Sequence, residues 1–147
     1  MVRLTPRTSP HATASLVALA RSGFFDGTIF HRIVPGFVIQ GGDPTQSGGG
    51  GPGYATVDTP GAGTRYVKGV VAMAKTATAP RGAAGSQFFV MTADAPSLAP
   101  DYAVVGQVVS GMDVVERIGE LGDSNDPNGR PTKTVLIDKV IAGSTGP

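Results

Sequence analysis

Few residues of this 147-residue chain could make or break covalent bonds. It contains no Cys, which excludes thiol catalysis, Cys-based zinc sites and disulfides. Its two histidines, His11 and His31, form no HExxH pair and leave little room for a histidine-rich metal site. Ser86 stands in Gly-Ser-Gln rather than in a nucleophile elbow. A GxGxxG match at residues 48–53 follows a polar turn and is interrupted by Pro52, so it does not indicate a nucleotide loop. We therefore expect neither a metal nor a cofactor.

Three runs remain in which aromatic and polar residues stand close together. They are Phe-His-Arg-Ile-Val-Pro-Gly-Phe-Val-Ile-Gln-Gly-Gly-Asp-Pro at 30–44, Gly-Val-Val-Ala-Met-Ala at 69–74 followed by Gly-Ser-Gln-Phe-Phe-Val at 85–90, and Tyr-Ala-Val-Val-Gly-Gln-Val-Val-Ser-Gly-Met-Asp-Val-Val at 102–115. In this order they resemble the cyclophilin family of peptidyl-prolyl cis–trans isomerases, from about Val2 to near the C-terminus. The resemblance implies an antiparallel eight-stranded barrel with two helices. It also implies an enzyme that rotates X-Pro bonds and assists protein folding.

Arg32 is the residue whose chemistry suits such a reaction. Resonance gives the X-Pro bond a rotational barrier of roughly 18–20 kcal/mol. Twisting the bond localises the lone pair on the prolyl nitrogen, so a donor aimed there stabilises the twisted state more than the planar one. Arg is always protonated and forked, and a hydrogen bond to a charged group is worth roughly 1.5–3 kcal/mol. Arg32 alone would supply about one to two orders of magnitude in rate.

The resemblance also assigns the substrate-binding residues. The proline pocket would be formed by Phe37, Val38, Phe89 and Leu98, with Tyr102 at its edge. Gln40 and Gln87 would position the substrate backbone and carbonyl. The backbone at Ala74, Lys75 and Thr76 would line the adjoining groove, with Gly49 on the opposite rim.

Each assignment has a structural alternative. Arg32 could be a surface arginine on a strand, and Phe37, Phe89 and Tyr102 could be packing residues. The glutamines could satisfy only neighbouring backbone groups. Two alternatives concern the whole chain: a module that binds proline-containing peptides with little turnover, or a destabilised fragment. Arg32 favours the enzyme, because proline recognition alone needs no charged donor at the nitrogen.

Composition limits the class of protein and its partners. A length of 147 residues suits one domain, residues 1–147, with a core that needs no disulfide or metal. A net charge of +1 with 16% charged residues argues against nucleic acid as partner. The apolar runs are far shorter than a membrane helix, and residues 1–10 do not resemble a signal peptide. We expect a cytoplasmic, bacterial-type monomer that acts on proline-containing polypeptides.

Periodicity predicts the elements that carry these residues. A helix is expected from Pro10, capped by Ser9, to Gly23, and a second over 111–118, capped by Ser110. Strands are expected over residues 28–34, 37–40, 69–74, 86–91, 104–109 and 135–141. Residues 45–63 and 76–85 are predicted to be irregular loops.

The N-terminus departs from the family pattern. Residues 2–6 resemble the end of the family's second strand, so the usual first strand is missing. Since that strand closes the barrel, we expect an unpaired edge and exposed apolar surface.

Three substitutions separate the chain from the best-known eukaryotic members: Ser97 replaces Trp, Tyr102 replaces His, and Lys75 replaces Asn. The Trp is associated with tight binding of cyclosporin. We therefore predict weak cyclosporin binding, measured by titration calorimetry, and a nanomolar dissociation constant would contradict this.

Overall fold

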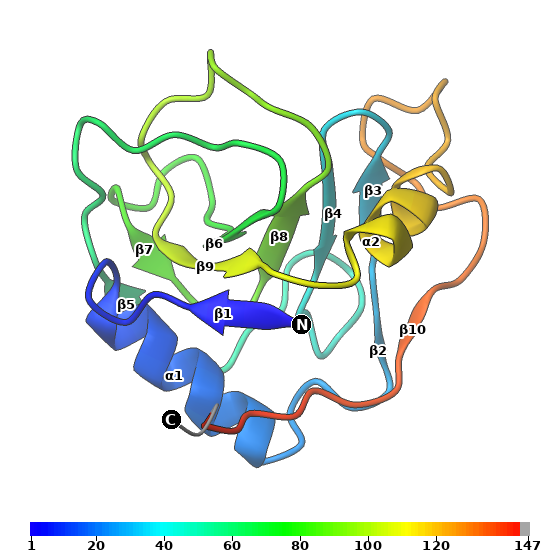
Figure 1. Cartoon of the computed structure of the whole chain (residues 1–147). Coiled ribbons are helices and arrows are strands. Elements are labelled where there is room, and N and C mark those ends of the chain that lie inside the picture. Colours follow the sequence, from blue (N-terminus) through cyan, green and yellow to red (C-terminus); the bar gives the residue numbers. More distant parts are fainter. Residues whose placement is uncertain (145–147) are drawn as a thin grey trace.

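The computed structural model describes residues 1–144, which form two helices and ten short strands (Figure 1). The helices are α1 (Pro10–Arg21) and α2 (Met112–Gly119). The strands are β1 (Val2–Leu4), β2 (Thr28–Ile29), β3 (Arg32–Val34), β4 (Val38–Gly41), β5 (Thr56–Val57), β6 (Val70–Met73), β7 (Ala83–Ala84), β8 (Phe88–Met91), β9 (Val104–Val108) and β10 (Leu136–Ile137). Neither helix in this part of the chain is long and apolar enough to cross a bilayer.

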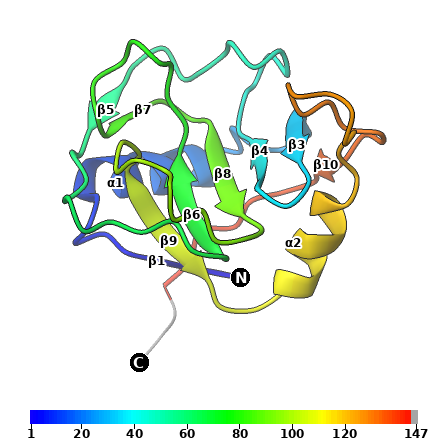
Figure 2. The same ribbon diagram turned by 90° about the horizontal axis from the view of Figure 1, so that it is seen from above.

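Six strands form one antiparallel sheet in the order β1-β9-β6-β8-β4-β3. Two further antiparallel pairs, β2 with β10 and β5 with β7, lie beside it. Helix α1 lies near β1 and β5, whereas α2 packs against β3 and β4, and the two views show the helices well apart (Figures 1 and 2). The sheet is therefore covered from different sides by elements distant in sequence.

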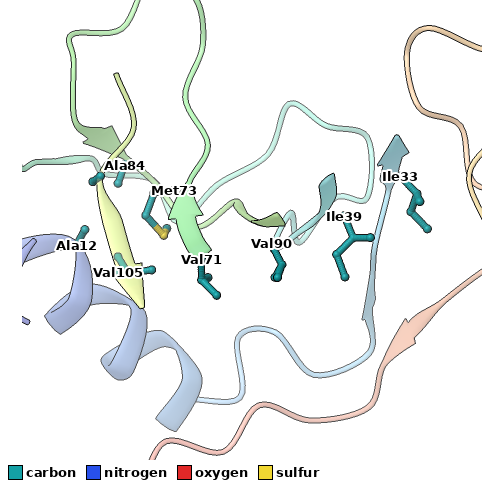
Figure 3. Close-up of a cluster of buried hydrophobic side chains, with 9 residues drawn as sticks. Ala12, Ile33, Ile39, Val71, Met73, Ala84, Val90 and Val105 are labelled. Carbon is teal, nitrogen blue, oxygen red and sulfur yellow. The ribbon is translucent and has the colours of Figure 1, made fainter. Parts of the chain in front are cut away.

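Both faces of the central strands are buried, which explains their unbroken apolar sequences. Side chains alternate between faces along a strand. One face supplies a first cluster together with α1 (Figure 3); its buried members are Ala12, Ile33, Ile39, Val71, Met73, Ala84, Val90, Ala103 and Val105. The other face supplies a second cluster, with Val38, Tyr66, Val70, Ala72, Phe89 and Met91 buried. The aromatic residues singled out in the sequence belong to this second cluster or pack against it.

The prediction of α1 is confirmed, but the Ser9 side chain does not cap its N-terminus as expected. Ser9 occupies the N-cap position without a side-chain hydrogen bond to the helix. Instead, the Asp58 carboxylate accepts hydrogen bonds from the Ala12 amide at 2.7 Å and from His11 Nδ1 at 2.8 Å. Burial alone would raise the pKa of Asp58, but these hydrogen bonds outweigh it and lower the pKa. A carboxylate from a distant loop thus stabilises the positive end of the helix.

The predicted cap of the second helix is wrong. Ser110 lies one residue too early, because Gly111 is the N-cap residue and α2 begins at Met112. Gly111 has φ 82°, a left-handed conformation that glycine adopts without steric cost. The chain therefore turns sharply before the helix rather than entering it through a serine cap.

Three segments differ from the predicted strands and loops. The strand expected over residues 28–34 is broken at 30–31, because Ile29 pairs with Leu136 of β10 while Arg32 pairs with Gln40 of β4. The loops at 45–63 and 76–85 contain β5 and β7, which pair with each other. Two-residue strands of small and β-branched residues carry no periodic signal, so only the fold reveals them.

The expected unpaired edge is present at β1. One side of β1 pairs with β9, and no strand of residues 1–144 pairs with its other side. A hollow of about 470 Å³ lies between α1 and residues 4–6, where β1 ends. Its lining is mainly apolar and consists of Leu4, Pro6, Pro10, Thr13, Ala14, Val17, Ala18 and Arg21.

Two glycines with similar backbone conformations allow a matched test of the packing at the end of β4. Gly36 has φ 72° and open space where a methyl group would stand, whereas Gly42 has φ 90° and the Ser86 carbonyl directly against that position. Gly36→Ala should cost about 1–2 kcal/mol of unfolding free energy, from conformational strain alone. Gly42→Ala should cost a further 1–3 kcal/mol, roughly, from overpacking. Denaturant unfolding measures both, and equal losses would contradict the close approach of residues 42 and 86.

Candidate active site

The register of the sheet places the chemically interesting residues in one row. Arg32 of β3 is paired with Gln40 of β4, Gln40 with Phe89 of β8, and Phe89 with Ala72 of β6. Directly opposed residues in antiparallel strands project from the same face. A guanidinium, an amide and an aromatic ring therefore stand side by side on the face of the second cluster.

A chain of hydrogen bonds extends from the guanidinium. Arg32 Nη1 donates to Gln40 Oε1 at 3.3 Å, and Gln40 Nε2 donates to Gln87 Oε1 at 3.0 Å. Gln87 Nε2 in turn donates to the carbonyls of Gly48 and Gly50, each at 2.9 Å. Both glutamine orientations follow from this direction of donation. Within residues 1–144, Arg32 forms no ion pair with a carboxylate, so its charge remains available to another group.

A buried carboxylate shapes the glycine-rich loop at the end of this chain. Asp43 is fully buried and accepts hydrogen bonds from Thr45 N, Thr45 Oγ1, Ser47 N and Gly48 N at 2.5–3.0 Å. Burial by itself would raise its pKa, but these donors outweigh it and lower the pKa to about 2. A side chain on Gly50 would collide with Asp43 and Thr45, so the loop needs glycine there.

His31 adds no positive charge to the site at neutral pH. Its burial lowers the pKa, an effect that Asp43 partly opposes and neighbouring Arg32 reinforces. Its Nδ1 is buried without a hydrogen-bond partner in the described chain. The imidazole is therefore neutral at pH 7, and Arg32 is the cation at this point.

The apolar part of the site is built around Tyr66, which sequence reasoning missed. Tyr66 Oη accepts from the Tyr102 amide at 2.9 Å and donates to the Tyr102 carbonyl at 2.8 Å. Phe89 and Tyr102 meet edge to face with ring centroids 5.4 Å apart. Phe37 and Leu98 are partly exposed at the rim, whereas Val38 is buried beneath them. Tyr66 lies in a loop without periodic pattern, so no signal in the sequence marked it.

A groove of about 420 Å³ adjoins this apolar surface. Six of the residues predicted to bind substrate line it: Gln40, Gly49, Ala74, Lys75, Thr76 and Gln87. The groove is completed by small residues at 48, 50, 55, 79 and 83–86. Lys75 connects the groove with the second cluster, since its Nζ lies 5.6 Å from the centre of the Tyr102 ring.

The structure thus brings the predicted residues into two adjoining groups. Phe37, Val38, Phe89, Leu98 and Tyr102 gather in the second cluster, and the other six binding residues surround the groove. Arg32 and Gln40 lie at their junction through the row described above. Asp43 was also missed, although an Asp before Pro-Thr is typical of a turn in which the carboxylate binds the backbone.

Comparison with known proteins identifies the family. A sequence model described as cyclophilin type peptidyl-prolyl cis-trans isomerase/CLD matches residues 1–142. The chain belongs to this family. The peptidyl-prolyl cis-trans isomerase B of Bacillus subtilis is 39% identical over 136 residues, which are 92% of this chain and 87% of the relative. The peptidyl-prolyl cis-trans isomerase A of Mycobacterium tuberculosis is 37% identical over 142 residues, or 95% and 75% of the two chains.

Solved structures agree with this assignment. A crystal structure of a Cryptosporidium parvum cyclophilin type isomerase, determined in the presence of the dipeptide Ala-Pro, superposes with a TM-score of 0.85. It is 29% identical and covers 98% of this chain and 92% of its own. The predicted mainly-β cyclophilin fold with two helices is therefore confirmed, as is the assignment to the peptidyl-prolyl isomerases.

Asp43→Asn tests whether the buried carboxylate organises the site of this cyclophilin. An amide offers one acceptor oxygen and brings an NH₂ group against backbone donors, so unfolding free energy should fall by about 2–3 kcal/mol at pH 7. Asp138→Asn, at an exposed position, is the control. NMR amide shifts of Gly48 and Gly50 should change in the Asp43 variant.

The difference in unfolding free energy between the unaltered chain and Asp43→Asn should depend on pH. The pKa of Asp43 in the folded chain, about 2, is below its ordinary 3.8, so its ionised form stabilises the folded state above pH 4. This contribution disappears as the pH falls from 4 towards 2. Urea unfolding of both chains should therefore show the difference shrinking in that range, and a difference independent of pH would contradict the role of the charge.

Proposed function

We propose that Arg32 is the catalytic residue of this cyclophilin and that its guanidinium donates a hydrogen bond to the prolyl nitrogen of an X-Pro bond. The nitrogen accepts well only when the bond is twisted and its lone pair is localised, so the contact favours the transition state over either planar isomer. No covalent intermediate and no proton transfer is needed. The observation that carries this proposal is the row Arg32–Gln40–Phe89, which sets a cation with no ion pair among residues 1–144 beside the partly exposed aromatic side chains of the second cluster.

The hydrogen-bond chain supports catalysis by fixing the donor before substrate arrives. Gln40 accepts one N–H of Arg32, and Gln87 restrains Gln40 from the other side. A guanidinium has five N–H donors, so one can be used for orientation while others face the substrate. Preorganised donors avoid the cost of reorientation during the reaction.

We assign the proline ring to the pocket of Phe37, Phe89, Leu98 and Tyr102, with Val38 as its floor. Phe89 and Tyr102 contact each other edge to face, and two hydrogen bonds join Tyr66 to the backbone of Tyr102. These contacts fix the spacing between the Phe89 and Tyr102 rings. Burial of a proline ring there removes apolar surface from water and anchors one side of the rotating bond. Rotation then proceeds on the other side, towards the groove.

We assign the residues that precede proline to the groove. The prolyl nitrogen carries the preceding residue. Gln40, which accepts a hydrogen bond from Arg32, and Gln87, which accepts one from Gln40, both lie in the wall of the groove. The backbone of Ala74, Lys75 and Thr76 lies on one rim and Gly49 on the other. Flexible, proline-containing polypeptides are the substrates that such an open groove accepts, and we propose that the chain acts on them as a monomer in the cytoplasm.

Exchange NMR on a blocked Ala-Pro peptide tests the role of Arg32. The unaltered chain should accelerate cis–trans exchange, and Arg32→Ala should reduce kcat/KM by at least about 10- to 100-fold, the value of a charge-assisted hydrogen bond. Arg32→Lys, which keeps the charge but not the fork, should lose less. Arg7→Ala is the control at an exposed arginine distant from the site.

The peptide affinity distinguishes catalysis from binding. In Arg32→Ala it should remain within a few-fold of the unaltered chain, because the lost contact forms in the transition state. Equal exchange rates in the two chains, each with a well-dispersed amide spectrum, would overturn the catalytic role and favour a binding module.

A further inference from the structure

Lys75 is a cation at the junction of the groove and the proline pocket. Its side chain is half-buried, with Nζ 5.6 Å from the centre of the Tyr102 ring. Its hydrogen bonds are to two carbonyls, those of Thr76 and Ala79, both at 3.3 Å. These contacts are long for an ammonium group. Its charge-assisted hydrogen bonds to carboxylates have donor–acceptor distances of roughly 2.7–2.9 Å. The ammonium is thus held near the rim by weak partners.

The charges around Lys75 leave it uncompensated. No carboxylate of residues 1–144 forms an ion pair with it, and Asp101, the acidic residue next to Tyr102, pairs with Arg81 at 3.3 Å. Asp43 is already surrounded by four donors of its own loop, and His31 is neutral. A peptide in the groove therefore meets two cations, Arg32 and Lys75, without a matching anion from the protein.

We propose that Lys75 gives this isomerase a preference for peptides with an acidic side chain at the residue immediately preceding proline. The inference rests on the proposed orientation of the substrate, in which the residues before proline run into the groove beside Lys75. A Glu side chain at that position can offer a carboxylate to Nζ, which exchanges two long carbonyl contacts for one charge-assisted bond. A lysine can follow its partner because its stem is flexible and carries three donors.

The size of the preference follows from the solvent exposure of the ion pair between Lys75 and the peptide carboxylate. Ion pairs at protein surfaces yield a two- to fivefold preference, roughly, and salt weakens them. The carboxylate is bound in both the planar and the twisted peptide, so the preference should lie in KM and in peptide affinity rather than in kcat. It should diminish when ionic strength rises from about 0.01 M to about 1 M.

The experiment compares blocked Ala-Xaa-Pro-Phe peptides with Glu, Gln or Lys at Xaa. Exchange NMR gives kcat/KM, and amide-shift titration gives the affinity for each peptide. In the unaltered chain the Glu peptide should exceed the Gln peptide two- to fivefold, roughly, at low salt. Lys75→Gln should bring that ratio to about one, and Lys75→Glu should reverse it so that the Lys peptide is preferred to the Gln peptide. Lys139→Gln, at an exposed lysine that does not line the groove, should keep the original ratio.

Ratios within one variant are independent of its folded fraction, so a partly unfolded variant still reports the preference. A Glu-to-Gln ratio of one in the unaltered chain, or a ratio retained in both Lys75 variants, would overturn the inference. Failure of the proposed catalytic function gives a different result. In that case exchange of every peptide is unaccelerated, and the affinity ratios alone confirm or refute the role of Lys75.

Discussion

The antiparallel register of β3, β4 and β8 is the constraint on which the site depends. It fixes Arg32 opposite Gln40 and Gln40 opposite Phe89. Because strand side chains alternate with a period of two, a slip of one residue would turn each of them to the opposite face. The register is itself held by burial on both faces, since Ile33, Ile39 and Val90 occupy the first cluster while Phe89 occupies the second. The packing of the core and the geometry of the candidate site are therefore set by the same register.

The candidate binding surface is continuous with the hydrophobic core. The second cluster is fully buried at Ala72, Tyr66 and Met91 and becomes partly exposed at Phe37 and Tyr102. Aromatic side chains suit the boundary between the buried and the exposed part of the cluster, because most of each ring packs in the core while one edge reaches the surface. The Tyr66 hydroxyl, bonded twice to the backbone of residue 102, ties the rim to the core. The ring contacts of Tyr66 with Phe89 and Tyr102 further fix these two side chains relative to the buried core.

Buried carboxylates organise the parts of the chain that lack regular structure. Asp43 gathers the donors of the glycine-rich loop, and Asp58 joins a second loop segment to the start of α1. Each satisfies backbone N–H groups that the irregular chain would otherwise leave unpaired. The carbonyls of Gly48 and Gly50 are consequently positioned to accept hydrogen bonds from Gln87. Through Gln87 and Gln40, the conformation of the loop is thus connected with the orientation of Arg32.

Local sequence determined the candidate site residues, the two helices and most of the strands, because these depend on residue type, periodicity and motifs of adjacent residues. It also determined the family, through runs at 30–44 and 85–90 that cover the site. Only the tertiary structure decided the β5–β7 pair, the α1 cap from Asp58 and the place of Tyr66. Each of these is a contact between residues far apart in the sequence, and its energy comes from burial and hydrogen-bond geometry that exist only after the chain has folded.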